Sequence, residues 1–299
     1  MRNFRFKKID AFTKAGSSGN PAACVYLNKE AECDDMQKIA QELKGYVSEV
    51  VYCLPIDNED NVNYSLLYYS SECEVEFCGH GTIACMYDLV TNTPELINIK
   101  EIGIRTRKGD LTVYNKLSAM EAVFITAPLP EYNGTNLGAD TISENLGIPE
   151  AWIDTNHPID LINAGLNTLI VPINSLNNIV SIWPNMSSLK DFCLANHIDI
   201  ITVFTTEVHD ASNKIHTRVF APKYGYLEDP ATGSGNSAVG YYFLKNNLWK
   251  GHCISIEQGP SLEAANIIKL DTIINADGGR QVLFGGSAAT RIDGIYTLY

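Results

Sequence analysis

The chain has little positive charge and no long apolar run. Of its 299 residues, 22 are Lys or Arg and 35 are Asp or Glu, which gives a formal net charge of −13 at pH 7. Nucleic-acid phosphates attract a basic stripe, so this charge balance argues against a nucleic-acid partner. No run approaches the roughly 18 apolar residues of a membrane span, and residues 1–8 lack the apolar core of a signal peptide. We expect a cytoplasmic protein that does not bind membranes.

The eight cysteines form no CxxC pair, and their spacing is irregular. Most of them stand within apolar runs, as Cys24, Cys53, Cys85 and Cys193 do. Disulfide frameworks and structural zinc sites have recognisable, paired spacings. We therefore expect reduced thiols in the protein core, as in a reducing compartment, and we predict no metal site.

The two halves of the chain resemble each other. Gly19-Asn20-Pro21 and Gly165-Leu166-Asn167 each precede an apolar run, and they are 146 residues apart. Two glycine-rich turns that open predicted helices, 78–82 and 232–236, are 154 residues apart. The offset stays close to half of the chain, and the order of the predicted elements is shared. This pattern indicates duplication of one domain-sized unit rather than chance similarity between two α/β segments.

The length and the 45% hydrophobic content are sufficient for two ordinary domain cores. We expect an N-terminal repeat over residues 1–117 and a C-terminal repeat over 118–286. Residues 287–299 form a candidate strand that completes the first repeat.

Apolar periodicity and turn residues predict the elements of both halves. In the first half we expect helices over 34–44 and 79–90, and strands over 9–12, 22–27, 50–54, 64–69, 96–104 and 111–114. In the second half we expect a helix that is capped by Ser187 or Ser188 and ends near 196, a helix over 235–246, and strands over 168–171, 200–205, 218–221, 254–257, 267–270, 282–284 and 295–298.

The two glycine-rich turns are candidate anion sites. The first N–H groups of a helix have no partner within the helix and stand at the positive end of its dipole, so they bind a carboxylate without Arg or Lys. His80 and Ser234 lie within the turns and add side-chain donors, and Asp229 could accept from an amine or hydroxyl. The alternative is that both turns only cap helices. The duplication favours a site for a small anionic substrate.

Glu49 is a candidate general base. It stands at the entrance of a predicted strand, where an inward carboxyl group suits proton transfer. The local sequence alone favours a solvent-facing carboxylate, because Glu is rarely buried. The corresponding stretch of the second half, 200–203, has no acidic residue. One half therefore offers a base and the other does not.

Together these segments resemble the PhzF-like phenazine-biosynthesis isomerase family. The resemblance covers nearly the whole chain. The segments that carry it are Gly19-Asn20-Pro21, Ser48-Glu49, Glu74 with 77–82, 229–234, 257–259 and Gly285-Gly286.

The resemblance implies an α+β fold of two pseudo-symmetric, diaminopimelate-epimerase-like domains. Each domain is a mostly antiparallel sheet wrapped around a central helix, with the active site in the cleft between the domains. It further implies a homodimer and an isomerase that needs no metal or organic cofactor. The family's namesake isomerises a dihydro-hydroxyanthranilate by removing a proton at one carbon and returning it at another.

By position, the resemblance makes Glu49 the proton-shuttling residue. His80, Asp229 and Ser234 match family residues that surround the substrate, so they join Glu49 as the catalytic set. The predicted substrate-binding positions are Asn20, Ser48, Cys78, Gly79, Gly81, Thr82, Thr232, Gly233 and Gly235.

Two alternatives stay open. Racemases and epimerases of this fold use two thiols, and Cys78 matches the first of them. The second position is Thr232, whose hydroxyl is far too weak an acid, so a two-thiol racemase is disfavoured. The other alternative is a non-catalytic protein that binds a small anion. The segment 67–71 and Glu76 depart from the family pattern, which leaves room for a substrate that is smaller or less acidic than the phenazine precursor.

Overall fold

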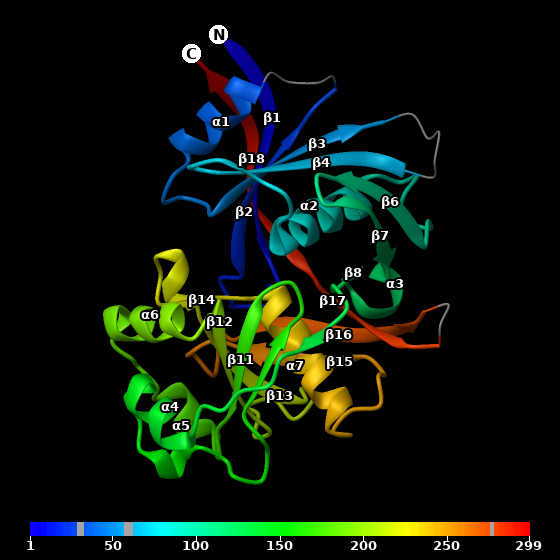
Figure 1. Cartoon of the computed structure of the whole chain (residues 1–299). Helices are drawn as coiled ribbons and strands as arrows, with labels where there is room; N and C mark the ends of the chain where they lie inside the picture. Colours follow the sequence, from blue (N-terminus) through cyan, green and yellow to red (C-terminus); the bar gives the residue numbers. More distant parts are fainter. Residues whose placement is uncertain (29–32, 57–61, 276–277) are drawn as a thin grey trace. The chain divides into compact units, whose positions relative to one another are not determined.

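The computed structural model describes residues 1–28, 33–56, 62–275 and 278–299, which fall into two compact units. Unit 1 comprises residues 1–13, 18–126 and 285–299, and unit 2 comprises residues 14–17 and 127–284. The C-terminal strand belongs to unit 1 because it pairs antiparallel with the N-terminal strand (Figure 1). Residues 118–126 also belong to unit 1, because their strand pairs with the preceding one. The repeat boundary expected at 117 therefore differs from the unit boundary by nine residues.

Unit 1 contains a sheet in the order β18-β1-β2-β3-β4-β6-β7-β8, with the short strand β5 also paired to β4. Among these pairs of described strands, β2–β3 and β4–β6 are parallel. Its strands are β1 (Arg2–Ala11), β2 (Asn20–Tyr26), β3 (Glu49–Pro55), β4 (Val62–Ser70), β5 (Glu74–Val75), β6 (Glu101–Thr106), β7 (Gly109–Asn115), β8 (Val123–Thr126) and β18 (Ala288–Leu298).

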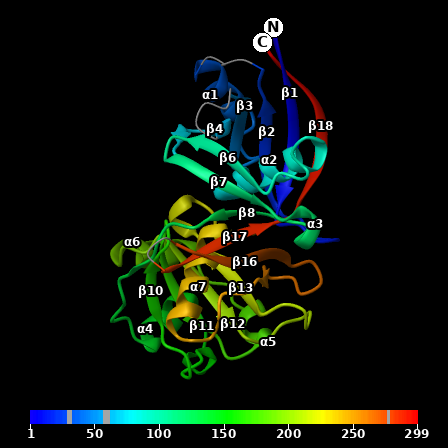
Figure 2. The same cartoon turned by 90° about the vertical axis from the view of Figure 1, so that its right-hand side faces the viewer.

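The centre of unit 1 is helix α2 (Gly79–Asn92), which contacts β1, β2, β3, β8 and β18 (Figure 1, Figure 2). Residues 81–86 of this helix are all buried, as expected for a helix that is apolar on every side. A second core forms on the other face of the strands, under helix α1 (Cys33–Glu42). The short helix α3 (Leu117–Met120) connects β7 to β8.

Unit 2 is built in the same way around helix α7 (Gly233–Lys245), which contacts β10, β11, β12 and β16. Its outer core packs under helices α4 (Ala139–Leu146), α5 (Leu176–Val180) and α6 (Met186–Ala195). Its strands are β9 (Glu131–Tyr132), β10 (Asp160–Asn163), β11 (Asn167–Pro172), β12 (Ile200–Thr205), β13 (Ile215–Phe220), β14 (Glu228–Asp229), β15 (Ile254–Gln258), β16 (Asn266–Ile274) and β17 (Arg280–Gly286), the last of which crosses the unit boundary. Two 3-10 turns, Glu150–Trp152 and Pro222–Tyr224, complete the elements.

The strand pairings of the two units repeat each other. In unit 1, β1–β2 is antiparallel, β2–β3 parallel, β3–β4 antiparallel and β4–β6 parallel. In unit 2, β10–β11 is antiparallel, β11–β12 parallel, β12–β13 antiparallel and β13–β15 parallel. The expected α+β fold of two similar domains, each with a central helix, is confirmed. Strand β12 is therefore the counterpart of β3.

Two of the differences from the sequence prediction have a cause in the hydrogen bonds. The strand predicted over 96–104 begins only at Glu101, because Nδ2 of Asn115 donates to the carbonyl groups of Leu96, Ile97 and Ile99 and holds them out of the sheet. Helix α6 is capped by Asn185, whose Oδ1 accepts from Ser188 N at 3.0 Å, and not by Ser187 or Ser188. Within the described ranges, no helix is long and apolar enough to cross a membrane.

Candidate functional site

Glu49 is the first residue of β3, and its side chain faces the central helix of unit 1. The next residue, Val50, is 1% exposed and belongs to the core under α1. Because side chains alternate along a strand, Glu49 and Val51 share the opposite face, towards α2. The Glu49 side chain is 24% exposed, so its carboxylate is partly shielded from solvent.

Cys78 caps the N-terminus of α2. Its backbone is extended, and its sulfur accepts the N–H of Gly81 at 3.3 Å, as a cap residue does in the first turn of a helix. Cys78 is 7% exposed. The sulfur therefore lies at the positive end of the helix dipole, in contact with an N–H donor.

Glu49, Cys78 and His80 meet at this helix end. Oε2 of Glu49 lies 3.4 Å from Nε2 of His80 and 3.8 Å from Sγ of Cys78. Sγ of Cys78 lies 3.5 Å from Nδ1 of His80. Three groups that can hold or transfer a proton thus lie in one cluster, which we call the Glu49 cluster. Each also offers one metal-ligating atom, and these atoms lie within 4.8 Å of one another, so the cluster could hold a metal ion.

Gly81 allows the helix to lie this close to β3. A Cβ atom at position 81 would stand 2.7 Å from Cγ2 of Val51 and 3.0 Å from Sγ of Cys78, which is closer than carbon and sulfur atoms pack. The neighbouring Thr82 is fully buried, and its hydroxyl donates to the Cys78 carbonyl at 2.7 Å and contacts the hydroxyl of Tyr68 at 2.7 Å. These two positions hold the cap in place.

Three further predicted residues lie on the same or neighbouring elements. Asn20 begins β2 and is 3% exposed, and two residues later Ala22 pairs with Glu49 across the parallel β2–β3 ladder. Ser48 precedes β3 and is exposed. Gly79 is the first residue of α2.

In unit 2 the equivalent helix cap is a hydrogen-bonded network. Thr232 caps α7, and its hydroxyl donates to Oδ2 of Asp229 in β14. Gln258 at the end of β15 accepts the Thr232 N–H at 2.9 Å, and its amide donates to the Asp229 carbonyl and the Thr232 hydroxyl. Asn236 donates to the same Gln258 oxygen at 2.7 Å. Asp229 and Thr232 are therefore joined by a side-chain hydrogen bond.

Ser234 stands half-buried in the first turn of α7, next to Gly233 and Gly235. Within the described part of the chain its hydroxyl has no hydrogen-bond partner. Gly235 repeats the role of Gly81, because a Cβ atom there would stand 3.0 Å from Oγ1 of Thr202 on β12. The first turn contains no acidic residue, and Thr232 makes no side-chain cap, so this helix end suits an external anion.

Sequence reasoning assigned no role to Gln258 or Asn236. Both are fully buried and orient the Thr232 cap. The signal for Gln258 was present in the segment Glu257-Gln258-Gly259, which carried part of the family resemblance. Asn236 is the last residue of the second glycine-rich turn, and its role follows only from the contact with β15.

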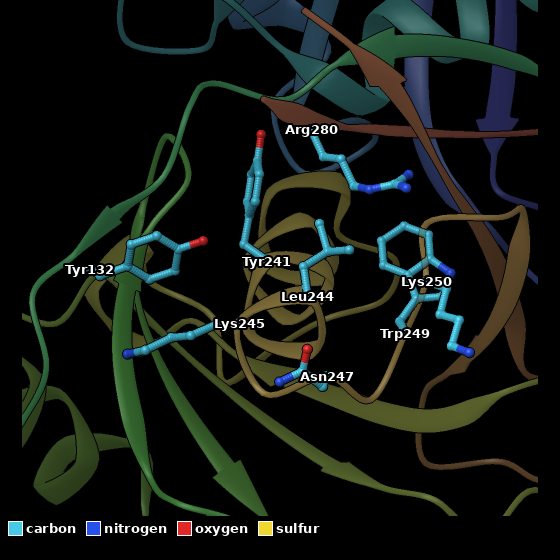
Figure 3. A pocket seen from close by; sticks show the side chains of 8 residues that line it. All are labelled: Tyr132, Tyr241, Leu244, Lys245, Asn247, Trp249, Lys250 and Arg280. Atoms are coloured by element: carbon cyan, nitrogen blue, oxygen red, sulfur yellow. The ribbon is translucent and has the colours of Figure 1, made fainter. Parts of the chain in front are cut away.

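A surface cavity of about 540 Å³ in unit 2 contains none of the predicted site residues. It surrounds the C-terminal turn of α7, and the ammonium groups of Lys245 and Lys250 point to opposite sides (Figure 3). Lys245 is paired with Asp160 at 2.7 Å. The cationic groups that line the cavity do not converge on a common point, so the cavity lacks the arrangement of an anion site.

The duplicated sheets around central helices define a protein of the diaminopimelate-epimerase-like fold. The structure of a Bacillus anthracis phenazine biosynthesis protein of the PhzF family has this fold. It matches the chain with a TM-score of 0.86 and 21% identity over 100% of both chains.

The family model described as phenazine biosynthesis-like protein (PhzC-PhzF) matches residues 9–294, and the chain belongs to this family. Antisense-enhancing sequence 1 of Schizosaccharomyces pombe is 30% identical over 301 residues, which cover 98% of this chain and 99% of that protein. A protein named uncharacterized isomerase from Clostridium acetobutylicum is 26% identical over 300 residues, or 96% of each chain.

Proposed function

We propose that the protein is a cofactor-independent isomerase that moves a proton on a small amino- or hydroxy-carboxylate, with Glu49 as its single base. The isomerase class accords with its family and with the names of its curated relatives. The observation that carries the one-base mechanism is the Glu49 cluster. Glu49 lies against His80 and Cys78 at the N-terminus of α2, whereas the first residue of the equivalent strand β12 is Ile200.

In this mechanism, the Glu49 carboxylate removes a proton from a carbon next to an electron-withdrawing group. The electron pair of the broken C–H bond moves into the conjugated system of the substrate. The resulting Glu49 carboxylic acid exchanges its proton with solvent and then gives a proton to another carbon, so that substrate and product have the same composition. N–H groups at the N-terminus of α2 stabilise the negative charge that develops. His80, 3.4 Å from the carboxylate, holds Glu49 in position.

The cap of α7 supports one base rather than two. A two-base racemase needs a second acid that exchanges protons near neutral pH. Thr232 stands at the equivalent cap, and its hydroxyl already donates to Asp229 and accepts from Gln258. This arrangement suits substrate binding by Asp229 and Ser234.

The test is deuterium incorporation in D₂O, measured by mass spectrometry. The compounds are dihydro-hydroxyanthranilate, a set of amino acids and a set of hydroxy acids. Wild type is run beside Glu49→Gln, Cys78→Ala and the matched control Glu76→Gln, an exposed glutamate two residues before the cap. We expect one compound class to gain deuterium with wild type, Glu76→Gln and Cys78→Ala, and not with Glu49→Gln.

Other outcomes distinguish the alternatives. Exchange that survives in Glu49→Gln and is lost in Cys78→Ala would replace the proposal with a thiol-dependent racemase. Equal ligand binding by wild type and Glu49→Gln in calorimetry, with no exchange in either, would make the protein a small-anion-binding protein.

A further inference from the structure

The Glu49 cluster brings together three different kinds of metal ligand. Its ligand atoms are a carboxylate oxygen, a thiol sulfur and an imidazole nitrogen. If Nε2 of His80 is the nitrogen, the three separations are 3.4 Å to Oε2 of Glu49, 3.9 Å to Sγ of Cys78, and 3.8 Å between that oxygen and sulfur. Nε2 is thus within 3.9 Å of both partners, while Nδ1 of His80 lies 3.5 Å from Sγ of Cys78.

These separations are close to those of a tetrahedral zinc site. Zinc bonds are about 2.0–2.1 Å to nitrogen or oxygen and about 2.3 Å to sulfur. Tetrahedral angles then place the ligand atoms roughly 3.3–3.6 Å apart. Side-chain shifts of a few tenths of an ångström would bring all three residues into bonding distance, without movement of β3 or α2.

The electrostatics also suit a divalent cation. Binding of a metal ion displaces the proton of the Cys78 thiol, and the thiolate then offers two negative charges together with the Glu49 carboxylate. The net charge of −13 raises the local concentration of cations. The side chains of His80 and Glu49 are 14% and 24% exposed, so an ion can reach the cluster from solvent.

We propose that the Glu49 cluster binds one Zn²⁺ through Glu49, Cys78 and His80, and that this binding inhibits the enzyme reversibly. Three protein ligands leave the fourth tetrahedral position for water or a substrate carboxylate. The bound ion occupies the oxygen of Glu49 that would accept the substrate proton, so proton transfer stops. The inhibition rests on the proposed function, whereas the binding does not.

Binding is tested on the full-length, reduced protein after dialysis against a chelator. Zn²⁺ is titrated in competition with a chromophoric chelator, and Co²⁺ is used separately as a spectroscopic substitute. The variants are Cys78→Ser, Glu49→Gln and the matched control Cys73→Ser, which removes an exposed thiol outside the cluster. Circular dichroism and thermal unfolding establish that each variant is folded.

We expect wild type and Cys73→Ser to bind one equivalent of Zn²⁺. Cys78→Ser and Glu49→Gln should bind it about 100-fold more weakly or worse, because the loss of even an outer-shell partner lowers metal affinity by about 10–100-fold. Co²⁺ should give a thiolate charge-transfer band in wild type and not in Cys78→Ser. Equal affinity in wild type and both cluster variants, or no binding by wild type, would overturn the site.

Inhibition is read from deuterium exchange with and without Zn²⁺, followed by a chelator. We expect loss of exchange and its recovery. Binding at the cluster with unchanged exchange would overturn the inhibition alone. If the cluster binds Zn²⁺ but the protein exchanges deuterium into no compound, the metal site is supported and the proposed isomerase activity is contradicted.

Discussion

Oε2 of Glu49 lies 3.4 Å from Nε2 of His80, a residue of the first turn of α2. This contact ties the start of β3 to the helix end and fixes where the carboxylate can receive a proton. Glu49 comes before the helix by 30 residues, so its orientation depends on packing between elements rather than on local sequence.

The first prediction concerns this contact. His80→Gln should lower the initial rate of deuterium exchange by about 10–100-fold, because a misplaced catalytic group loses on that order of rate. Glu49→Gln should lower it further, because the base itself is absent. Exchange rates of both variants, with Glu76→Gln as control, measure the difference. A larger loss in His80→Gln than in Glu49→Gln would make His80 the base.

The second prediction concerns the packing of α2 on β3. Gly→Ala within a helix ordinarily stabilises by about 1 kcal/mol. Gly81→Ala should instead destabilise by about 1–3 kcal/mol, because its Cβ atom would stand 2.7 Å from Val51. Urea unfolding measures the effect on Gly81→Ala and on the double variant Gly81→Ala/Val51→Ala. The control is Gly294→Ala, because position 294 has open space around it. If the second substitution restores no stability to Gly81→Ala, the clash is not the cause.

The third prediction concerns a buried ion pair in unit 2. Arg218 has a fully buried side chain, and it donates to both carboxylate oxygens of Glu228 and to carbonyl groups of the 179–182 segment. Arg218→Ala should reduce the free energy of unfolding by about 3–5 kcal/mol, since it leaves a shielded carboxylate unpaired.

Chemical denaturation checks the third prediction. Arg105→Ala, which breaks an exposed pair with Asp110, should leave the free energy of unfolding nearly unchanged. In the double variant Arg218→Ala/Glu228→Gln, the loss of unfolding free energy should be smaller than the sum of the two single losses, because no unpaired charge remains. Strictly additive losses would contradict the charge explanation.

The fourth prediction concerns pH. Burial raises the pKa of Glu257, but hydrogen bonds from His216, Asn213 and the N–H groups of residues 209 and 210 outweigh it. They hold the pKa below its ordinary value of 4.5. A carboxylate with a lowered pKa stabilises the fold above its unfolded-state pKa, and this stabilisation is lost as the pH falls through the folded-state pKa.

Glu257→Gln should therefore be less stable than wild type at pH 7, and the difference should shrink below about pH 4.5. Urea unfolding of both proteins between pH 7 and pH 3 provides the measurement. A difference that is constant over this range would show that Glu257 acts by shape and not by charge.

Much of the fold could be predicted because apolar spacing reflects local burial. The strand predicted over 200–205 is β12 itself, and the helix predicted from residue 79 is α2. The strand predicted over 96–104 was too long, because the Asn115 side chain acts from 16–19 residues away. Apolar periodicity does not register contacts of that kind.

The sequence by itself determined the duplication, the two helix caps and the presence of a carboxylate in one half only, since these depend on residue types at fixed spacings. Only the tertiary structure decided that Glu49 meets Cys78 and His80, and that Gln258 orients Thr232. The Glu49 cluster depends on the close packing of Gly81 on Val51, and the Gln258–Thr232 contact depends on the pairing of β13 with β15. Both bring together residues far apart in the chain, and no local pattern encodes such distances.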